Sequence, residues 1–350
     1  MPTRRHGTGV WWLLGCITLA FVITQLEGCQ RAKEAEVVVY TSVDDVFARP
    51  IAEQFQRSTG IEVRLVPDTE ETKSTGLLNR LIAEKARPQA DVFWSGDPVR
   101  AAVLKRQGIS AAYRPANPAD ARGQFSDPDG HWAALSARAR VVLYNTHLVS
   151  AGEANGRLES FLDPKWKGRT CVANPLFGTT SMHAAALFEA MGEEQAKGFF
   201  TALRDNGVQM LSSNGEVKRH VADGSCAFGL TDTDDAHVAI QEGKPVVMRY
   251  AGIGGRGALI VPNAAVLIAG APNGEAGRHF IDYLVSPEAE EALAASPAAQ
   301  MPLRPGVPVP KGVEHVGDVT TMPVEYEQLA SQLETLSRGW LKDWVDTMAR

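Results

Sequence analysis

The chain has 350 residues, of which 44% are hydrophobic, and its formal net charge is -6. A chain of this length and composition can bury a large core and is expected to fold as two domains. The acidic balance argues against general nucleic-acid binding.

The first 29 residues have the pattern of an export signal. Arg4 and Arg5 precede an apolar run over residues 10–26, and a small-residue site ends at Cys29. This order resembles a bacterial lipoprotein signal, in which the cysteine is lipidated and becomes the new N-terminus. We therefore expect a periplasmic or extracytoplasmic protein tethered by lipid at Cys29. The alternative is that the apolar run stays uncleaved as an anchoring helix.

The first part of the body alternates strands with helices. Strands are predicted over residues 36–42, 61–66 and 90–94, with helices over 46–59 and 74–86 between them. Alternation of this kind predicts a parallel sheet, and ligands bind beyond the carboxyl ends of its strands. The loops that carry Ser42, Asp44 and Asp97 are expected to converge there.

A long β-prone run over residues 135–145 is suited to crossing between domains. Arg138 and Arg140 lie on one face of it, because side chains repeat every second residue in a strand. They form either a solvated edge or a cationic site beside an interdomain cleft, aimed at an anion. We favour the second interpretation for one arginine and leave open which.

The strand over 169–173 leads through a loop with one glycine, Gly178, into a helix-forming run over 184–191. Thr179, Thr180 and Ser181 stand where they can cap that helix. The free N–H groups of such a helix start bind anions and carboxylates well. An ordinary capped helix would show the same hydroxyls, so this stretch alone does not decide between the two interpretations.

A further strand near 208–211 precedes a short helix over 216–222, which is capped from Ser212–Asn214. The next strand, 226–230, ends in three acids and two threonines at Thr231–Asp235. These side chains suit a cation, a ligand ammonium or sugar hydroxyls, or they cap the next helix. Cys171 and Cys226 are placed in this same domain. They either pair in an oxidising compartment or serve as small buried hydrophobes.

The chain then returns to the first domain through residues 258–268, and helices follow near 274–284 and 287–295. An amphipathic tail runs to Trp340 and Trp344, which are expected to pack rather than to bind a cofactor. Gly252–Gly257 has the spacing of a dinucleotide fingerprint, but a β-prone run follows it where a helix is needed. No nucleophile or metal-binding motif of an enzyme is present in the sequence.

Taken in order, these segments resemble the solute-binding proteins of bacterial ABC importers, in the group that contains ferric-ion-binding proteins. The resemblance covers residues 37–309, and five stretches carry it: Val37–Ser42, Ala90–Trp94, Ala137–Thr146, Asp163–Gly168 and Ala299–Leu303. It implies a two-lobed α/β fold of the class II periplasmic-binding-protein type, with a two-stranded hinge and a ligand trapped in the interlobe cleft. We expect lobe one to comprise residues 36–140 and 265–350, and lobe two residues 141–264.

One departure from that group bears on the ligand. Ferric-binding members commonly carry adjacent tyrosines as iron ligands, whereas all six tyrosines here are isolated in the sequence. Carboxylate oxygens also suit Fe(III), and the resemblance then assigns the metal to Asp232 and Asp234. Relatives of this group bind phosphorylated or phosphonate-bearing molecules as well.

The sequence thus predicts a monomeric receptor, not an enzyme, that captures Fe(III) with a synergistic anion and delivers it to an ABC permease in the cytoplasmic membrane. A small anionic or zwitterionic organic solute ranks slightly below iron. An exported hydrolase or transferase on the same scaffold ranks last, because no activated nucleophile is found. The expected ligand-binding residues are Ser42, Asp44, Asp97, Arg138, Arg140, Gly178, Thr179, Thr180, Asn214, Thr231, Asp232 and Asp234.

Overall fold

The computed structural model describes residue 1 and residues 35–68, 75–120, 123 and 125–348. Residues 36–350 form one compact unit. The expected export signal and the lipidation site at Cys29 lie outside the described residues. Within the described part of the chain, no helix is both long and apolar enough to cross a membrane.

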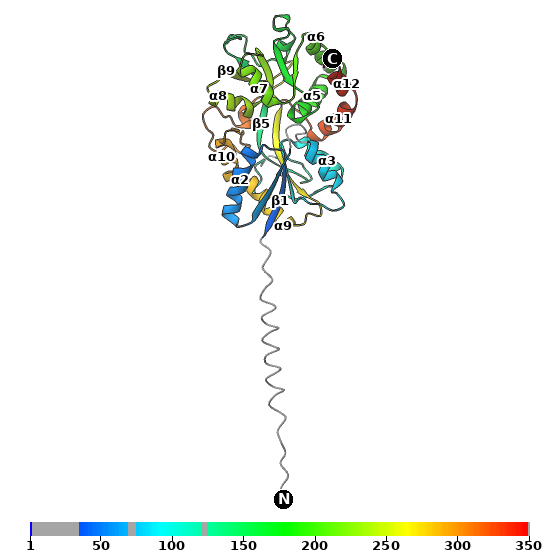
Figure 1. Ribbon diagram of the computed structural model, residues 1–350, viewed down its shortest axis with the longest axis vertical. Helices are drawn as coiled ribbons and strands as arrows, with labels where there is room; N and C mark the ends of the chain where they lie inside the picture. Colours follow the sequence, from blue (N-terminus) through cyan, green and yellow to red (C-terminus); the bar gives the residue numbers. More distant parts are fainter. Residues whose placement is uncertain (2–34, 69–74, 121–122, 124, 349–350) are drawn as a thin grey trace. The chain divides into compact units, whose positions relative to one another are not determined.

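The central element is a mixed sheet in which β2, β1, β3, β10, β5, β8, β6 and β7 lie side by side in that order. Its first half contains β1 (Glu36–Thr41), β2 (Glu62–Pro67), β3 (Val92–Ser95), β4 (Ser110–Ala111) and β10 (Ile260–Ile268). Strand β1 is parallel to β2 and β3, as the alternation predicts. Figure 1 shows these elements in blue, cyan and yellow.

Helices cover both faces of this first half, and β1, β3 and β10 are accordingly buried along nearly their whole length, whereas β2 is partly exposed. The helices are α2 (Asp45–Thr59), α3 (Thr75–Ala83), α4 (Pro98–Arg106), α9 (Gly274–Leu284) and α10 (Pro287–Ala295). Phe55 of α2 and Phe280 of α9 pack with Trp94 against one face. Leu77 and Leu104 pack with Phe93 against the other.

Strand β5 (Ala133–Asn145) joins the two halves of the sheet. Residues 133–139 pair with β10, whereas residues 140–144 pair with β8 (Phe228–Asp232) and 141–145 with β9 (Val246–Tyr250). The β5–β10 pairing shifts register between Pro262 and Asn263, and Ser136 opposite has a positive φ of 37°. The amide of Asn263 donates to the Ser136 hydroxyl at 2.9 Å and helps to hold this irregular pairing.

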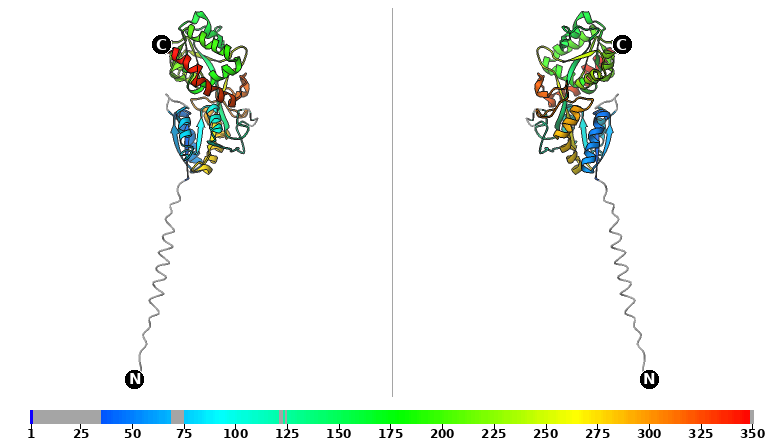
Figure 2. Two further views of the ribbon diagram at one scale, coloured as in Figure 1. Left: turned by 90° about the vertical axis from the view of Figure 1, so that its right-hand side faces the viewer. Right: turned by 90° about the vertical axis from the view of Figure 1, so that its left-hand side faces the viewer.

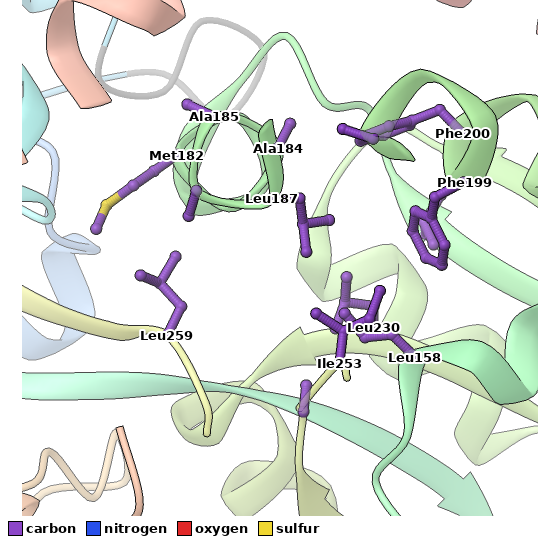
Figure 3. Close-up of a cluster of buried hydrophobic side chains, with 14 of the residues drawn as sticks. Leu158, Met182, Ala184, Ala185, Leu187, Phe199, Phe200, Leu230, Ile253 and Leu259 are labelled. Atoms are coloured by element: carbon purple, nitrogen blue, oxygen red, sulfur yellow. The ribbon is translucent and has the colours of Figure 1, made fainter. Parts of the chain in front are cut away.

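The second half adds β6 (Thr170–Ala173) and β7 (Gln209–Leu211), which are parallel to each other. Its helices are α5 (Gly178–Met191), α6 (Glu193–Asp205), α7 (Asn214–Ala222) and α8 (Thr233–Gln241). Figure 3 shows α5 above the sheet, with Leu187 directed toward Leu158 and Leu230 and with Phe199 and Phe200 of α6 to one side. Short 3₁₀ turns lie at Leu158–Leu162, Pro164–Trp166 and Val316–Asp318.

The C-terminal helices α11 (Tyr326–Arg338) and α12 (Trp340–Met348) share a core with the second half. Trp344 is buried there, and its indole N–H donates to the Phe200 carbonyl at 2.9 Å. The tryptophans of the tail are therefore packing residues, as expected. Figures 1 and 2 show this tail, in red, beside the green helices α5 and α6. Residues 265–350 are predicted to belong to lobe one. The lobe boundaries remain a prediction.

Candidate functional site

The centre of the site is a buried ion pair between neighbouring strands. Arg140 on β5 and Asp232 on β8 are register partners, and Arg140 Nη1 lies 2.6 Å from Asp232 Oδ1. Both residues are at most 1% exposed. Burial alone would raise the pKa of Asp232, but the charges of Arg140 and Arg138 outweigh it, and that pKa lies below its usual value.

The first turn of α5 completes this pair with hydroxyl groups. Thr179 donates to Asp232 Oδ2 at 2.6 Å and accepts from Arg140 at 3.1 Å. Thr180 accepts from the same guanidinium at 3.4 Å and donates to Asn214 at 3.1 Å. The amide of Asn214 in turn donates to Thr179 at 2.9 Å. Helix α5, helix α7 and strand β8 therefore meet at one point.

The expectation that these hydroxyls cap α5 is wrong. The helix begins at Gly178 with Phe177 as its N-cap residue, and no side chain caps it. Gly178 has a φ of 53°, a conformation that glycine adopts without strain. Thr179 and Thr180 instead take part in the ion-pair network. At α7, by contrast, Ser213 accepts from the Glu216 amide and caps the helix as expected.

Arg138 lies two residues before Arg140 and extends to the other half of the sheet. Its guanidinium donates to the carbonyl of Gly96, in the loop after β3. Its Nη1 also lies 3.5 Å from carboxylate oxygens of both Asp232 and Asp234. Both arginines thus contact Asp232, and which of them meets a ligand remains a prediction.

Two acids near Arg138, Asp232 and Asp234, have pKa shifts in opposite directions. Burial would lower the pKa of Arg138, but the charges of Asp234, Asp232, Asp44 and Asp97 outweigh it and raise that pKa. Burial raises the pKa of Asp234 to about 7, and neighbouring carboxylates add to this rise while Arg138 opposes it. Asp234 is therefore a carboxyl group that takes up or releases a proton near neutral pH.

The loops of the first half complete the site. The hydroxyl of Ser42 accepts from the Gly96 amide at 2.9 Å, and Asp97 caps α4 by accepting from the Arg100 amide at 3.1 Å. A Cβ on Gly96 would stand 3.2 Å from Arg138 Nη2 and 3.6 Å from Ser42 Oγ, so glycine lets both approach closely. Among the predicted site residues, Thr231 does not bond the two arginines. Its hydroxyl lies within hydrogen-bond distance of the Asn214 carbonyl and of Asp235 instead.

Sequence reasoning missed Arg100 and helix α4, which carries it. Asp97 followed by Pro98 is the pattern of an N-cap and a first helical residue, and it would have predicted the helix start. The side chain of Arg100 is 4% exposed and donates to Ser181 of α5 at 3.1 Å.

Several buried donors at this site have no hydrogen-bond partner. Among the described residues, the buried side-chain nitrogens without a hydrogen-bond partner include Nε of Arg138, Nε of Arg140 and Nη1 of Arg100. Buried guanidinium groups with unpaired donors are costly. An oxyanion would offset that cost, because its oxygens accept several N–H bonds at once.

Within the described residues, no group of three or more His, Cys, Asp or Glu side chains is arranged to hold a metal ion. Four tyrosine hydroxyls bond groups elsewhere in the described part of the chain: Tyr40 bonds Glu84, Tyr113 bonds Asp282, Tyr144 bonds the Gly156 amide and Tyr326 bonds the Ile260 carbonyl. The side-chain oxygen atoms near Arg138 and Arg140 that could ligate a metal belong to carboxylates, hydroxyls and an amide.

The sheet order and the helices on both faces define a mixed α/β periplasmic-binding-protein fold. The structure superposes with a TM-score of 0.78 on iron-bound HitA from Pseudomonas aeruginosa, at 22% identity over 87% of this chain and 98% of that one. That likeness confirms the expected fold.

A family model described as bacterial extracellular solute-binding protein matches residues 35–296. The chain therefore belongs to this family, in its ferric-binding-protein-like group. It is 28% identical to iron uptake protein A1 of Synechocystis over 88% of both chains. It is 27% identical, over 83% of this chain and 80% of the relative, to a Salmonella typhi protein named for periplasmic binding of 2-aminoethylphosphonate. The family binds solutes and does not transform them, so the expectation that the chain is not an enzyme is confirmed.

Proposed function

We propose that this protein is the receptor of an ABC importer for a small organic anion or zwitterion that carries a phosphonate or phosphate group. The observation that supports this most directly is the pair of buried arginines, Arg138 and Arg140, each with an Nε that has no hydrogen-bond partner, together with the bond from Arg140 to Thr179 in the first turn of α5. The amide groups of a helix N-terminus and guanidinium donors together suit a tetrahedral oxyanion.

The neighbouring acids give the same site a place for a positive group. Asp44, Asp232 and Asp234 all act electrostatically on Arg138. Asp232 is already held by Arg140 and Thr179, so we assign the ligand ammonium to Asp234. An aminoalkyl phosphonate would place its head group on the arginines and its ammonium on this acid. A relative named for 2-aminoethylphosphonate binding agrees with this chemistry.

Capture would proceed by closure of two lobes on the solute, with no bond made or broken. Ser42, Asp44, Asp97 and Arg138 would contribute from the first half, and Arg140, Gly178, Thr179, Thr180, Asn214, Thr231, Asp232 and Asp234 from the second. The crossing strands β5 and β10 would act as the hinge. Delivery to a permease in the cytoplasmic membrane requires that the receptor stay nearby, which the proposed lipid at Cys29 would achieve.

Fe(III) with a synergistic anion is the second candidate, favoured by the name of the Synechocystis relative, an iron uptake protein. Asp232 and Asp234 would supply carboxylate oxygens, and the arginines would hold the anion. We rank it second because Asp232 is bonded to Arg140 and Thr179, and a metal would have to displace these partners.

Native mass spectrometry with metal analysis tests the proposal on full-length protein purified without chelators. We expect a colourless protein with one bound organic mass that contains phosphorus. Stoichiometric iron with a visible charge-transfer band would contradict the proposal and favour the second candidate.

A further inference from the structure

Arg100 connects the two halves of the molecule beside the proposed ligand site. It lies in the first turn of α4, which follows β3 in the first half, and its Nη2 donates to Ser181 Oγ on α5 of the second half at 3.1 Å. The two residues are 81 positions apart in the sequence. An arginine buried to this degree needs acceptors for its charge.

The acceptors within the protein satisfy Arg100 only in part. Asp97 Oδ2 lies 3.4 Å from its Nη1, but neither of these two atoms has a hydrogen-bond partner. Ser181 accepts from Nη2 while its own hydroxyl donates to the Gly178 carbonyl at 2.7 Å. Arg100 therefore bonds the first turn of α5 through Nη2 and keeps donor capacity at Nη1.

Arg100 and Arg140 both bond hydroxyls in the first turn of α5. Arg100 donates to Ser181, and Arg140 donates to Thr179 and Thr180. Arg138 instead donates to the carbonyl of Gly96, the residue before Asp97, which is the ion-pair partner of Arg100.

We infer that Arg100 is a ligand-binding residue that selects a tetrahedral phosphonate or phosphate head group over a carboxylate. This inference rests on the proposed function. A carboxylate offers two oxygens, which Arg138 and Arg140 can engage, whereas a phosphonate offers a third for Arg100. The contact to Ser181 holds Arg100 in place as the two halves meet over the solute.

The test compares 2-aminoethylphosphonate with β-alanine, which has the same ammonium and carbon chain but a carboxylate head. Calorimetric titration of R100Q should show phosphonate affinity lower than wild type by about 10- to 100-fold, the loss expected for a charged hydrogen bond. Its affinity for β-alanine should change by less than about threefold. R100K keeps the charge without the planar fork and should fall between.

Two controls separate the possible failures. Arg57→Gln removes an exposed arginine of α2 and should change neither affinity. Arg138→Gln should weaken both probes. S181A serves as a second variant should R100Q fail to fold, and it should weaken phosphonate binding selectively through Arg100.

Equal phosphonate affinity for R100Q and wild type, with loss in R138Q, would overturn the role of Arg100 and leave the proposed function intact. An equal loss for both probes in R100Q would overturn the selectivity. A wild-type protein that binds no phosphonate or phosphate probe would overturn the proposed function and this inference together.

Discussion

Arg140 and Asp232 face each other across the β5–β8 pair, and their 2.6 Å ion pair is closed to solvent on all sides. Strand register alone brings them together, since each is a residue of the ladder. Thr179 and Asn214 then fill the remaining bonding positions of the carboxylate. This pair fixes where the first turn of α5 meets the sheet.

Removal of one partner should therefore cost stability. Asp232→Asn leaves Arg140 without its main counter-charge, and we expect the free energy of unfolding to fall by about 3–5 kcal/mol. Urea denaturation followed by circular dichroism measures this. Asp45→Asn, in an exposed pair with Arg49, should leave stability nearly unchanged. Equal, small effects for both variants would show that the buried pair does not anchor the site.

The raised pKa of Asp234 implies that both stability and ligand binding depend on pH. Because burial raises its folded-state pKa to about 7, the folded protein holds a proton that the unfolded chain has lost above about pH 4. Its contribution should lower stability as pH rises from about 4 to 7, with no further change above that. Binding of an ammonium-bearing solute should strengthen as the pH rises from about 4 to 8, and it should release a proton from Asp234. Calorimetry at pH 6 and 8 measures this, and a pH-independent affinity identical to that of Asp234→Asn would contradict it.

His183 is a buried histidine whose two ring nitrogens both lack hydrogen-bond partners. Burial and the charge of Arg140 lower its pKa to about 3, so the ring is neutral. It faces a mainly apolar cavity lined by Leu187 and Phe199, among others. His183→Leu should therefore keep or raise stability, since it removes an uncompensated polar group. His237→Leu is the matched control and should lower stability, because His237 bonds Gln241. A loss for His183→Leu as large as that for His237→Leu would mean that the imidazole has a partner.

Cys171 and Cys226 are both buried and are free thiols in the structure, which leaves the buried-hydrophobe alternative in place. Burial and the neighbouring Cys226 raise the pKa of Cys171, so its reactive thiolate is scarce. In the mature chain we expect an aromatic disulfide reagent to label neither thiol under native conditions and both in guanidinium. No labelling in guanidinium without reductant would instead indicate a disulfide.

Hydrophobic periodicity located most elements, including α9 at 274–284 and α10 at 287–295 with their observed bounds. It missed α4 because nearly all its residues are buried, so the helix has no polar face to reveal its period. It also missed α6, although Phe199, Phe200 and Leu203 mark one apolar face. That Thr179 bonds Asp232 instead of capping α5 depends on tertiary contact, which local patterns do not contain.

Chain topology indicates where the candidate site residues lie, but it does not indicate their bonding partners. Strand ends and helix starts indicated Ser42, Asp97 and Asp232, because chain topology places such positions on one edge of a sheet. The sequence did not indicate Arg100, since its role depends on Ser181, far along the chain. Which carboxylate pairs with which arginine is likewise a matter of side-chain geometry.

The proposed site can be checked by a crystal structure of the protein with 2-aminoethylphosphonate. We expect phosphonate oxygens in hydrogen-bond contact with the guanidinium of Arg138 and with the first-turn amides of α5, and the ammonium beside Asp234. A phosphonate bound elsewhere, or Fe(III) on Asp232 and Asp234 with the arginines unoccupied, would contradict it.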